Sequence, residues 1–510
     1  MKRYLYLWHR WLGIVLCLFM ALWFVSGVVM LYVGYPKLTP AERLAPLPPL
    51  PAKSCCVGLE TALAASGEHA APQSVKLTSI AGAPHYLLGY PGKPHVAIDA
   101  RNGQRIAALD EADALAAGKA FANGAAVQYL GLVQQDAWSH SRALDTERPF
   151  HVVQVADAER RRLYISQHNG RVVRDVTVQE RRWNWLGAWL HWLYPLRGGV
   201  FDHWAADVVI YLSLAGTLAA ILGQVIGLMR WRFAKPYRSG SRSPYPGGFA
   251  RWHHIGGLLF GFVLIAWIFS GLVSMRPWQL FASQSTLSHA AYQGAELRPE
   301  AFALSAGQAL ARFEQAGFAP RELDWRITAG VAYLVAHERN GIRRVLPAAG
   351  MAEPSLQVAG TLLEHAALAM QADAHANFTW LTGYDFYYFP RAEQSLYGHM
   401  SRPLPMLRVR FDDPASTWVH IDPYSGEVIE QLDQRMRVYR WLFNLLHSWD
   451  WPVLLERPLL REALIIVFSV GGLLISVSGA VLGWRRLRRS SGEPRKARGG
   501  GPICRLRGDS

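Results

Sequence analysis

Two stretches of the chain, Trp8-His9-Arg10-Trp11-Leu12-Gly13 and Trp252-His253-His254-Ile255-Gly256-Gly257, each open a long apolar run. The first run carries Ser26-Gly27 and the second carries Ser270-Gly271, so all of these matching positions are 244 residues apart. An internal repeat of this size is typical of a membrane protein built from two equivalent halves. A histidine occupies the same place in each half.

A second pair of matching segments ends in Leu190-His191 and in Leu446-His447, with an offset of 256 residues. Each half then reads as an apolar span, a polar region, a short aromatic helix and a second span. Because each half holds an even number of spans, both insert in the same orientation, with a pseudo-twofold axis along the membrane normal. Equivalent histidines are therefore expected at equal depth, facing each other across that axis.

Four apolar stretches separate the polar parts of the chain. A transmembrane helix needs about 20 apolar residues. The stretches that reach this length without a charged residue are Gly13–Gly34, Val208–Met229, Ile255–Met275 and Ala463–Trp484. We expect an integral membrane α-helical protein with a four-helix core of two parallel repeats and α+β domains outside the membrane.

The net charge of +15 is unevenly distributed. Lys2, Arg3 and Arg10 precede the first span, six Lys or Arg and no acid lie between Arg230 and Arg251, and nine basic residues follow Trp484. Basic residues at span ends mark the cytoplasmic side, so this charge indicates topology and not nucleic-acid binding. We expect a multi-pass protein of the bacterial inner membrane, with both termini cytoplasmic and both large domains periplasmic.

The polar regions contain a smaller repeat. The segments Ile98–Gly103, Ile165–Gly170 and Ile421–Gly426 each read as a strand that ends in a glycine-containing turn, where a positive φ is needed. Alanine-rich helices are expected before the turns, at about 55–66, 111–122, 301–316 and 359–372. This predicts two small α+β units per half.

The expected segments are 1–34 (N-terminal segment and first span), 35–180 (outer domain), 181–202 (interfacial helix), 203–230 (second span), 231–251 (basic loop), 252–275 (third span), 276–436 (outer domain), 437–460 (interfacial helix), 461–484 (fourth span) and 485–510 (basic tail).

The spacing of histidine and glycine in the spans indicates a flat ligand. His9 and Gly27 are 18 residues apart, which is five full turns, so they share one helix face. In the second and fourth spans the repeated glycines are Gly216, Gly227, Gly472 and Gly483. Imidazole can supply an axial ligand, and glycine lets a porphyrin approach the backbone.

The histidines therefore predict two non-covalent b-type haems. The expected pairs are His9 with His253 on the cytoplasmic side and His191 with His447 on the outer side. His254 and His203 are weaker candidates, because their repeat partners are Arg10 and Leu459. Bis-histidine ligation leaves no open iron position and suits electron transfer.

A competing interpretation needs no cofactor. Histidine and tryptophan at span ends are common interfacial anchors, and small residues mediate helix packing. The four cysteines form no C-x-x-C-H motif, so covalent haem attachment is excluded.

An aromatic segment of the second polar region supplies further candidates. Asp385, Tyr387, Tyr388 and Arg391 lie in it, and His399 follows closely. His140 belongs to the corresponding segment of the first half. These six residues are expected either to contact a substrate or the haem propionates, or to seat the outer domain on the membrane helices.

The span motifs resemble those of PepSY-associated transmembrane proteins. The segments Asp385–Tyr388, Pro403–Pro405, Arg408–Pro414 and Thr417–Gly426 are similar to the outer domain of that family. The resemblance implies a four-helix membrane core with PepSY-type α+β domains outside, and some members are di-haem reductases of iron-loaded siderophores. The first half departs from the pattern, with Ser-His-Ser at 139–141 where the family would have tyrosines.

These observations favour a di-haem membrane oxidoreductase that carries electrons outward to a ferric siderophore or another ferric chelate. The 231–251 loop is too short for a flavin or NAD(P)H domain. The electron donor is therefore expected to be a separate cytoplasmic reductase or a membrane quinol. The alternative is a non-enzymatic regulator, in which membrane-tethered PepSY domains bind a protein partner. A transporter is disfavoured because the spans contain almost no charge except Asp207.

Overall fold

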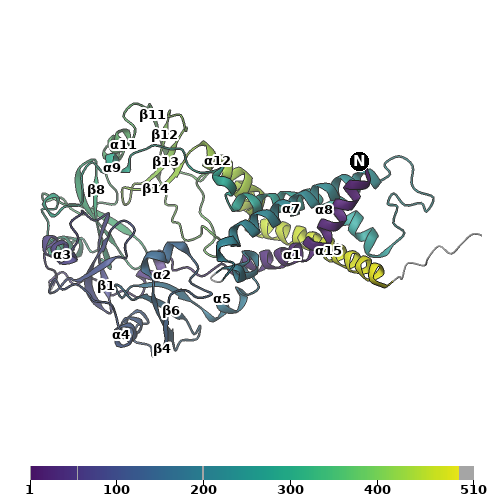
Figure 1. The fold of residues 1–510 in the computed structure, drawn as a ribbon. Coiled ribbons are helices and arrows are strands. Elements are labelled where there is room, and N and C mark those ends of the chain that lie inside the picture. Colours follow the sequence, from purple (N-terminus) through teal and green to yellow (C-terminus); the bar gives the residue numbers. More distant parts are fainter. Residues whose placement is uncertain (1, 54, 198–199, 493–510) are drawn as a thin grey trace, which may run out of the picture. The chain divides into compact units, whose positions relative to one another are not determined.

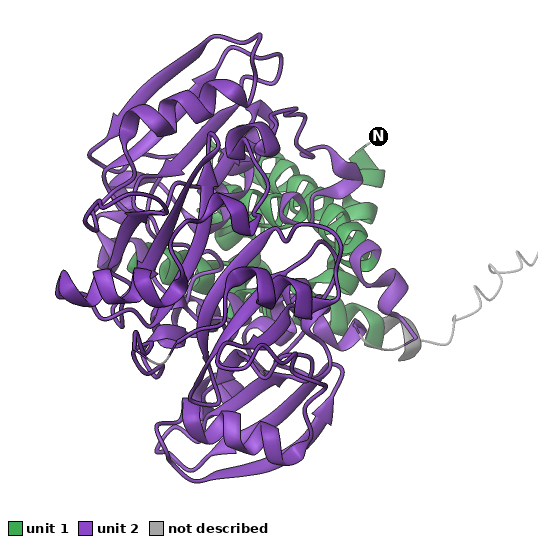
Figure 2. Ribbon diagram, turned by 90° about the vertical axis from the view of Figure 1, so that its left-hand side faces the viewer, with its two compact units in different colours: residues 1–25, 208–272, 463–510 green, residues 26–207, 273–462 purple. Residues whose placement is uncertain are grey.

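A computed structural model describes residues 2–53, 55–197 and 200–492 (Figure 1). The chain forms two compact units, coloured separately in Figure 2. The helix unit comprises residues 1–25, 208–272 and 463–510, and the sheet unit comprises residues 26–207 and 273–462. Each unit is assembled from segments of both halves of the sequence.

Four long helices supply the helix unit: α1 (Lys2–Tyr32), α7 (Ala205–Arg230), α8 (Gly248–Ser274) and α15 (Pro458–Gly492). All four are long and apolar enough to cross a membrane, as the sequence predicts. Many of their large apolar side chains point away from the protein, and Leu259 and Phe262 are each 68% exposed. Outward apolar side chains of this kind contact lipid, since lipid tails are as apolar as leucine.

Glycines allow close packing inside the helix unit. The expected inner face of α1 is buried, with Leu16 3%, Met20 6% and Phe24 8% exposed. A Cβ at Gly472 would lie 2.4 Å from the Phe24 ring, and one at Gly216 would lie 3.1 Å from Ile268. These glycines, together with Gly227 and Gly483, therefore face side chains of neighbouring helices.

Three antiparallel sheets form the sheet unit. Their strands are β1 (Ser74–Ile80), β2 (Ala83–Gly89), β3 (Val96–Asp99), β4 (Val127–Val133), β5 (Phe150–Val155), β6 (Arg162–Ser166), β7 (Val172–Val176), β8 (Glu322–Thr328), β9 (Val331–His337), β10 (Arg343–Pro347), β11 (Ala376–Leu381), β12 (Met406–Phe411), β13 (Trp418–Asp422) and β14 (Glu427–Leu432). The strand orders are β10-β9-β8-β1-β2-β3, β4-β5-β6-β7 and β11-β12-β13-β14. The two halves thus share the six-stranded sheet, and each half also builds one four-stranded sheet.

The junction between the halves is the pairing of β1 with β8, in which Val75 lies opposite Trp325 and Leu77 opposite Leu323. Helices cover the sheets: α3 (Leu59–Ser66), α4 (Glu111–Phe121), α10 (Ala306–Gln315) and α11 (Gly360–Ala369). These four agree with the helices expected from sequence. Gly103, Gly170 and Gly426 adopt φ values of +75°, +72° and +68°, as the repeated turn requires.

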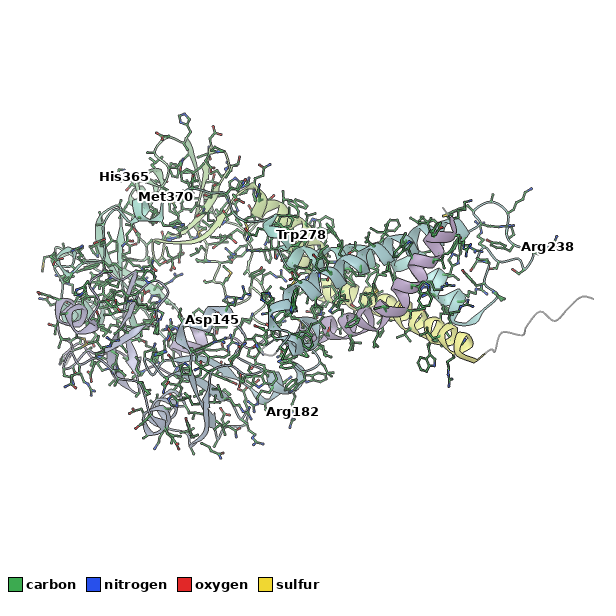
Figure 3. All side chains as sticks on the ribbon, in the orientation of Figure 1. Asp145, Arg182, Arg238, Trp278, His365 and Met370 are labelled. Carbon is green, nitrogen blue, oxygen red and sulfur yellow. A yellow bond between two sulfur atoms is a disulfide. The ribbon has the colours of Figure 1, made fainter. Side chains whose placement is uncertain are left out.

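Short helices complete the sheet unit: α2 (Pro40–Leu44), α5 (Val178–Trp183), α6 (Ala188–His191), α9 (His289–Gln293), α12 (Gln434–Arg440), the π-helical η6 (Trp441–Leu445), α13 (Leu446–Ser448), α14 (Pro452–Leu455) and the 3₁₀ turns η1 (Arg142–Glu147), η2 (Tyr194–Leu196), η3 (Asp202–Trp204), η4 (Pro277–Gln279) and η5 (Pro299–Ala301). Cys55 and Cys56 form a vicinal disulfide. In the basic loop between α7 and α8, Arg238 is exposed (Figure 3). Residues 493–510 of the predicted basic tail, including Cys504, lie outside the described residues.

A buried ion-pair network spans the junction of β1 and β8. Glu322 is 1% exposed and contacts Arg43 and Lys76. Burial alone would raise the pKa of Glu322, but Lys76 and Arg43 outweigh it and lower this pKa to about 2. Because an unfolded glutamate titrates near about 4.3, this carboxylate stabilises the fold fully above that pH. The contribution is lost as the pH falls from there toward 2.

We predict that Glu322→Gln destabilises the sheet junction by about 3 kcal/mol at pH 7, because it leaves the Arg43 guanidinium without its carboxylate partner and leaves Lys76 with Asp324 alone. It should also remove much of the acid sensitivity of β1 and β8. Hydrogen exchange of peptides from these two strands, in the intact protein in detergent, measures both effects. Glu314→Gln, at an exposed site on α10, is the matched control. Equal protection of β1 and β8 from hydrogen exchange in the two variants would contradict the stabilising role assigned to Glu322.

Candidate functional site

The first histidine pair, His9 and His253, lies in the helix unit. His9 belongs to α1 and His253 to α8. The centroids of the two imidazole rings are 6.2 Å apart, with 40° between the ring planes. The structure therefore brings together the two residues that the repeat predicts to be partners.

Each ring of the first pair is oriented by a backbone carbonyl. Nδ1 of His9 lies 3.0 Å from the Ala219 oxygen, and Nδ1 of His253 lies 3.0 Å from the Ile475 oxygen. A carbonyl can only accept, so Nδ1 carries the proton and donates in both rings. Nε2 is then the unprotonated nitrogen, whose lone pair can bind a metal. Residues 219 and 475 differ by 256, so the two acceptors are repeat equivalents.

Two glycines make room for the same rings. A Cβ at Gly223 would lie 2.6 Å from Cε1 of His9, and one at Gly479 would lie 3.1 Å from Cε1 of His253. These glycines also differ by 256 residues. Each imidazole is thus packed directly on the backbone of a facing helix, in the way expected for a histidine held in one orientation.

The second histidine pair, His191 and His447, lies in the sheet unit. Its ring centroids are 6.0 Å apart, at 68°. His191 ends α6, and its Nδ1 lies 3.0 Å from the hydroxyl of Ser26, which is fully buried. A Cβ at Gly27 would lie 3.6 Å from Cε1 of His191. This pair also joins two residues that the repeat predicts to be partners.

Both separations suit one metal ion between two imidazoles. A metal–imidazole bond is about 2 Å long and a ring centre lies about 1.1 Å behind its nitrogen, so a linear arrangement sets the centroids about 6.2 Å apart. The first pair has this spacing and the second is within a few tenths of an ångström of it. Each pair could therefore supply both axial ligands of a haem iron.

His254 and His203 are placed differently. Both ring nitrogens of His254 form hydrogen bonds within the protein, Nδ1 with Ser243 Oγ at 2.8 Å and Nε2 with the Gly227 oxygen at 3.0 Å. His203 is exposed and packs edge-on against Trp204. The structure gives neither residue a histidine partner among the described residues.

The aromatic segment is held together by its own polar groups. Asp385 forms an ion pair with Arg408 and accepts the backbone N–H groups of Tyr387 and Tyr388 at 2.9 Å. Tyr388 is fully buried and its hydroxyl donates to the Pro403 oxygen at 2.7 Å. Burial would raise the pKa of Asp385, but Arg408 outweighs it and lowers this pKa. These contacts favour a structural role.

The tip of Tyr387 connects this segment to the helix that leads to His447. Its hydroxyl accepts the indole N–H of Trp441 at 2.9 Å, and Trp441 begins η6 directly before α13. The ring of Phe443, also in η6, lies 5.4 Å from the His447 ring. The aromatic segment thus supports the element that carries the second pair.

The other three candidates have separate surroundings. Arg391 forms an ion pair with Asp450, three residues after His447. His140 is buried with its ring 4.8 Å from that of Tyr194, and burial lowers its pKa. His399 is exposed. Of these three, Arg391 is the one for which the described residues show an ion pair with the chain segment after His447.

One acidic cluster was not anticipated from the sequence. The ligand atoms of Glu322, Asp324 and His337 lie within 4.8 Å of one another. Lys76 contacts both carboxylates, and Arg326 contacts Asp324. Because these cations already neutralise the acids, the cluster is an ion-pair network and not a cation site. Alternating acids on β8 opposite a histidine on β9 are its only signal in the sequence.

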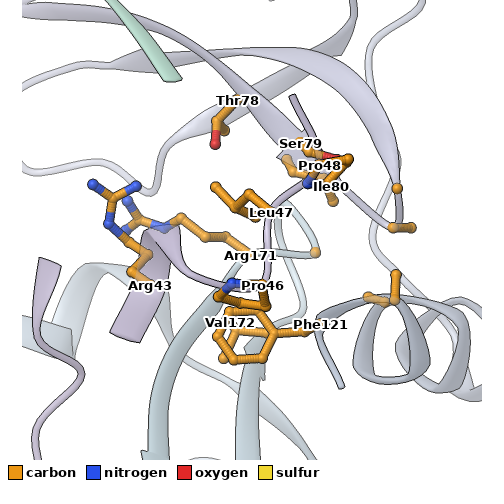
Figure 4. Close-up of a pocket in the computed structure, with 15 residues that line it drawn as sticks. Arg43, Pro46, Leu47, Pro48, Thr78, Ser79, Ile80, Phe121, Arg171 and Val172 are labelled. Atoms are coloured by element: carbon orange, nitrogen blue, oxygen red, sulfur yellow. The ribbon is translucent and has the colours of Figure 1, made fainter. Parts of the chain in front are cut away.

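A cavity beside this network is mainly apolar (Figure 4). Leu47, Phe121 and Val172 line it together with Arg43 and Arg171. Arg43 is bound to Glu322 and Arg171 to Glu147, so neither guanidinium offers an uncompensated charge. The cavity has no group suited to catalysis.

A comparison with protein families identifies a relationship for most of the chain. The family described as PepSY-associated TM region matches residues 6–335. The matched segment includes His9, His191 and His253 and ends before His447. No curated protein matches the chain.

We predict that Gly223→Ala destabilises the helix unit by about 1–3 kcal/mol, because the added methyl collides with the His9 ring. Gly257→Ala is the matched control, since nothing lies within 4 Å of its added Cβ. That control should be neutral or slightly stabilising, as alanine favours helix more than glycine. Thermal unfolding of the purified protein in detergent measures both changes, and equal midpoints would contradict the packing described for Gly223.

Proposed function

The chain belongs to the PepSY-associated TM family, and we propose that it is a di-haem b-type electron-transfer protein that reduces a ferric siderophore or a similar ferric chelate. The observation that carries the proposal is the geometry of the two histidine pairs. Their ring centroids are 6.2 and 6.0 Å apart. This spacing suits axial ligation of one iron by each pair.

The residues around the first pair support this role. Hydrogen bonds from Nδ1 to Ala219 and Ile475 hold the rings in the tautomer that presents Nε2. A ligand histidine usually donates its second N–H to a carbonyl or carboxylate, which makes it a more basic ligand. Ser478 adds a hydroxyl 3.1 Å from Nδ1 of His253.

The proposed core consists of two parallel repeats related by a pseudo-twofold axis. In the first pair, the ligands are related by an offset of 244, and both the carbonyl acceptors and the packing glycines are related by an offset of 256. A symmetric site built from two halves requires this correspondence of ligand, acceptor and packing residue. It supports ligation more strongly than the histidines alone.

The proposed orientation follows from charge. Basic residues flank the N-terminal end of α1, the α7–α8 loop and the C-terminal end of α15. The positive-inside rule assigns these ends to the cytoplasm of a bacterial inner membrane and the sheet unit to the periplasm. The first histidine pair then lies toward the electron donor and the second toward the acceptor.

Bound haem would supply one-electron chemistry at each histidine pair. The two imidazoles of each pair would hold the iron from both sides and leave it no open position, which favours electron transfer over oxygen binding. Reduction of Fe(III) to Fe(II) weakens its attraction to oxygen donors because the cation has a lower charge. Iron release therefore requires an electron and no catalytic acid or nucleophile. A separate cytoplasmic reductase or a membrane quinol would supply that electron.

We predict that the purified protein shows a b-type absorbance spectrum with two haems per chain. His9→Ala or His253→Ala should remove one haem, and His191→Ala or His447→Ala should remove the other, because each substitution deletes one axial ligand. Pyridine haemochrome quantification measures the stoichiometry. His69→Ala, at an exposed site, is the control and should retain both haems.

A correctly folded but colourless protein would contradict electron transfer and favour a membrane-tethered regulator that binds a protein partner. One haem per chain, lost only on substitution of one pair, would restrict the proposal to that pair. Circular dichroism and gel filtration of each variant distinguish lost haem binding from lost folding.

We predict that membranes containing the protein release Fe(II) from ferric siderophores faster than membranes containing His447→Ala. NADH is the reductant for the membrane electron-transfer chain, and a ferrous-specific chelator reports the product. A panel of chelates tests the acceptor. Equal rates in both membranes, with haem intact in the wild type, would refute iron reduction and leave electron transfer to another acceptor.

A further inference from the structure

Three arginines surround the chain segment that follows His447. Arg391 lies in the loop between β11 and β12, Arg440 ends α12, and Arg461 is in the first turn of α15. Arg391 forms an ion pair with Asp450, and Arg461 donates from Nε and Nη2 to the Ser448 oxygen at 2.9 and 2.7 Å. The cluster is thus fixed to residues one to three positions after a predicted ligand.

The third arginine is held from the aromatic segment. Nε of Arg440 donates to the Phe386 oxygen, and its guanidinium lies 5.0 Å from the Phe386 ring centre. Arg440 precedes His447 by seven residues, and the π-helical η6 lies between them. None of these contacts supplies a negative charge to Arg440.

The cluster brings three cationic side chains together, and one of them forms an ion pair with a carboxylate. Among the described residues, its ion pairs involve one carboxylate, that of Asp450, which is fully buried. Glu430 interacts instead with Arg402 and His420. Other carboxylates act on the cluster without forming an ion pair with it: Glu430 and Asp385 act electrostatically on Arg440, and Glu462 acts on Arg461.

Both burial and the two neighbouring arginines act on Arg391. Its side chain is only 11% exposed. Burial, and then repulsion from Arg461 and Arg440, lowers the pKa of Arg391 to about 9. Because arginine stays protonated in proteins, the ion pair with Asp450 only partly offsets the cost of burial and the repulsion from the other two arginines. A buried charge of this kind is costly unless an anion pairs with it.

Two of the three arginines, Arg440 and Arg461, occur in only one half of the repeat. At the offset of 256 that relates His191 to His447, Arg440 corresponds to Asn184 and Arg461 to Ala205. A haem on the axis between the halves carries both of its propionates on one edge of the ring. Its iron needs symmetric ligands, but its propionates need cations on one side only.

We infer that Arg391, Arg440 and Arg461 bind the two propionate carboxylates of the haem held by His191 and His447. This inference rests on the proposed function. Arginine suits the task because its planar donors match carboxylate geometry. A lipid phosphate offers similar chemistry, but the contacts to Ser448 and Asp450 place the cluster at the ligand segment and favour the haem.

The test compares haem with its dimethyl ester, in which both propionates are neutral. In a His9→Ala background only the second site binds, and titration of the haem-free protein in detergent gives both affinities. We expect haem to bind more tightly than the ester by about tenfold for each arginine–propionate contact. Combining Arg440→Gln with Arg461→Gln should reduce this preference to near unity, and the corresponding lysine variants should retain part of it.

Arg435→Gln, at an exposed site of α12, is the control and should keep the full preference. Equal affinity for haem and ester with the three arginines present would overturn the inference. So would an unchanged preference in the double variant accompanied by loss of stabilisation by vesicles of anionic lipid, which would assign the cluster to lipid phosphate. If the His9→Ala protein binds neither compound while it remains folded, the proposed function fails instead.

Discussion

The hydrogen bond from a histidine Nδ1 to an acceptor on a facing element is the interaction on which the proposed site depends. An unsupported imidazole can rotate and exchange tautomers, so it specifies no ligand position. Ala219 and Ile475 remove this freedom in the first pair, and Gly223 and Gly479 allow the rings to reach those carbonyls. The histidine positions are therefore determined by the backbone of α7 and α15.

The sheet unit provides a different kind of support. Strands β1 and β8 join the two halves in one six-stranded sheet, and the Glu322 network lies at that junction. This pairing joins both halves in one compact unit. Both histidines of the second pair belong to the same unit. The aromatic segment then fastens η6 through Tyr387 and Trp441, directly before the element that carries His447.

Much of this organisation could be predicted from the sequence. The four spans and the α+β units follow from hydropathy, alanine-rich segments and turn glycines, because these are local signals. The histidine partners follow from the repeat. Gly216 and Gly472 pack against side chains of neighbouring helices, and spacing along one helix does not specify which neighbours these are. Gly223 and Gly479 carry the same repeat signal, but only the packed helices show that they contact His9 and His253. The joining of β1 to β8 depends on strand pairing between residues about 250 positions apart in the sequence, which no local pattern specifies.

The departures from symmetry are as informative as the repeat. A twofold arrangement of ligands is suited to a metal, whose two axial bonds are equivalent. Substituents on one edge of a ring break that symmetry. An electron donor and an electron acceptor on opposite sides of a membrane would break it as well. Arg440 and Arg461, on the segments that flank His447, correspond to Asn184 and Ala205 in the first half. Duplication alone would have copied them. A site with symmetric axial ligands, in which the anionic groups lie on one edge of the bound ring, requires cations in one half only.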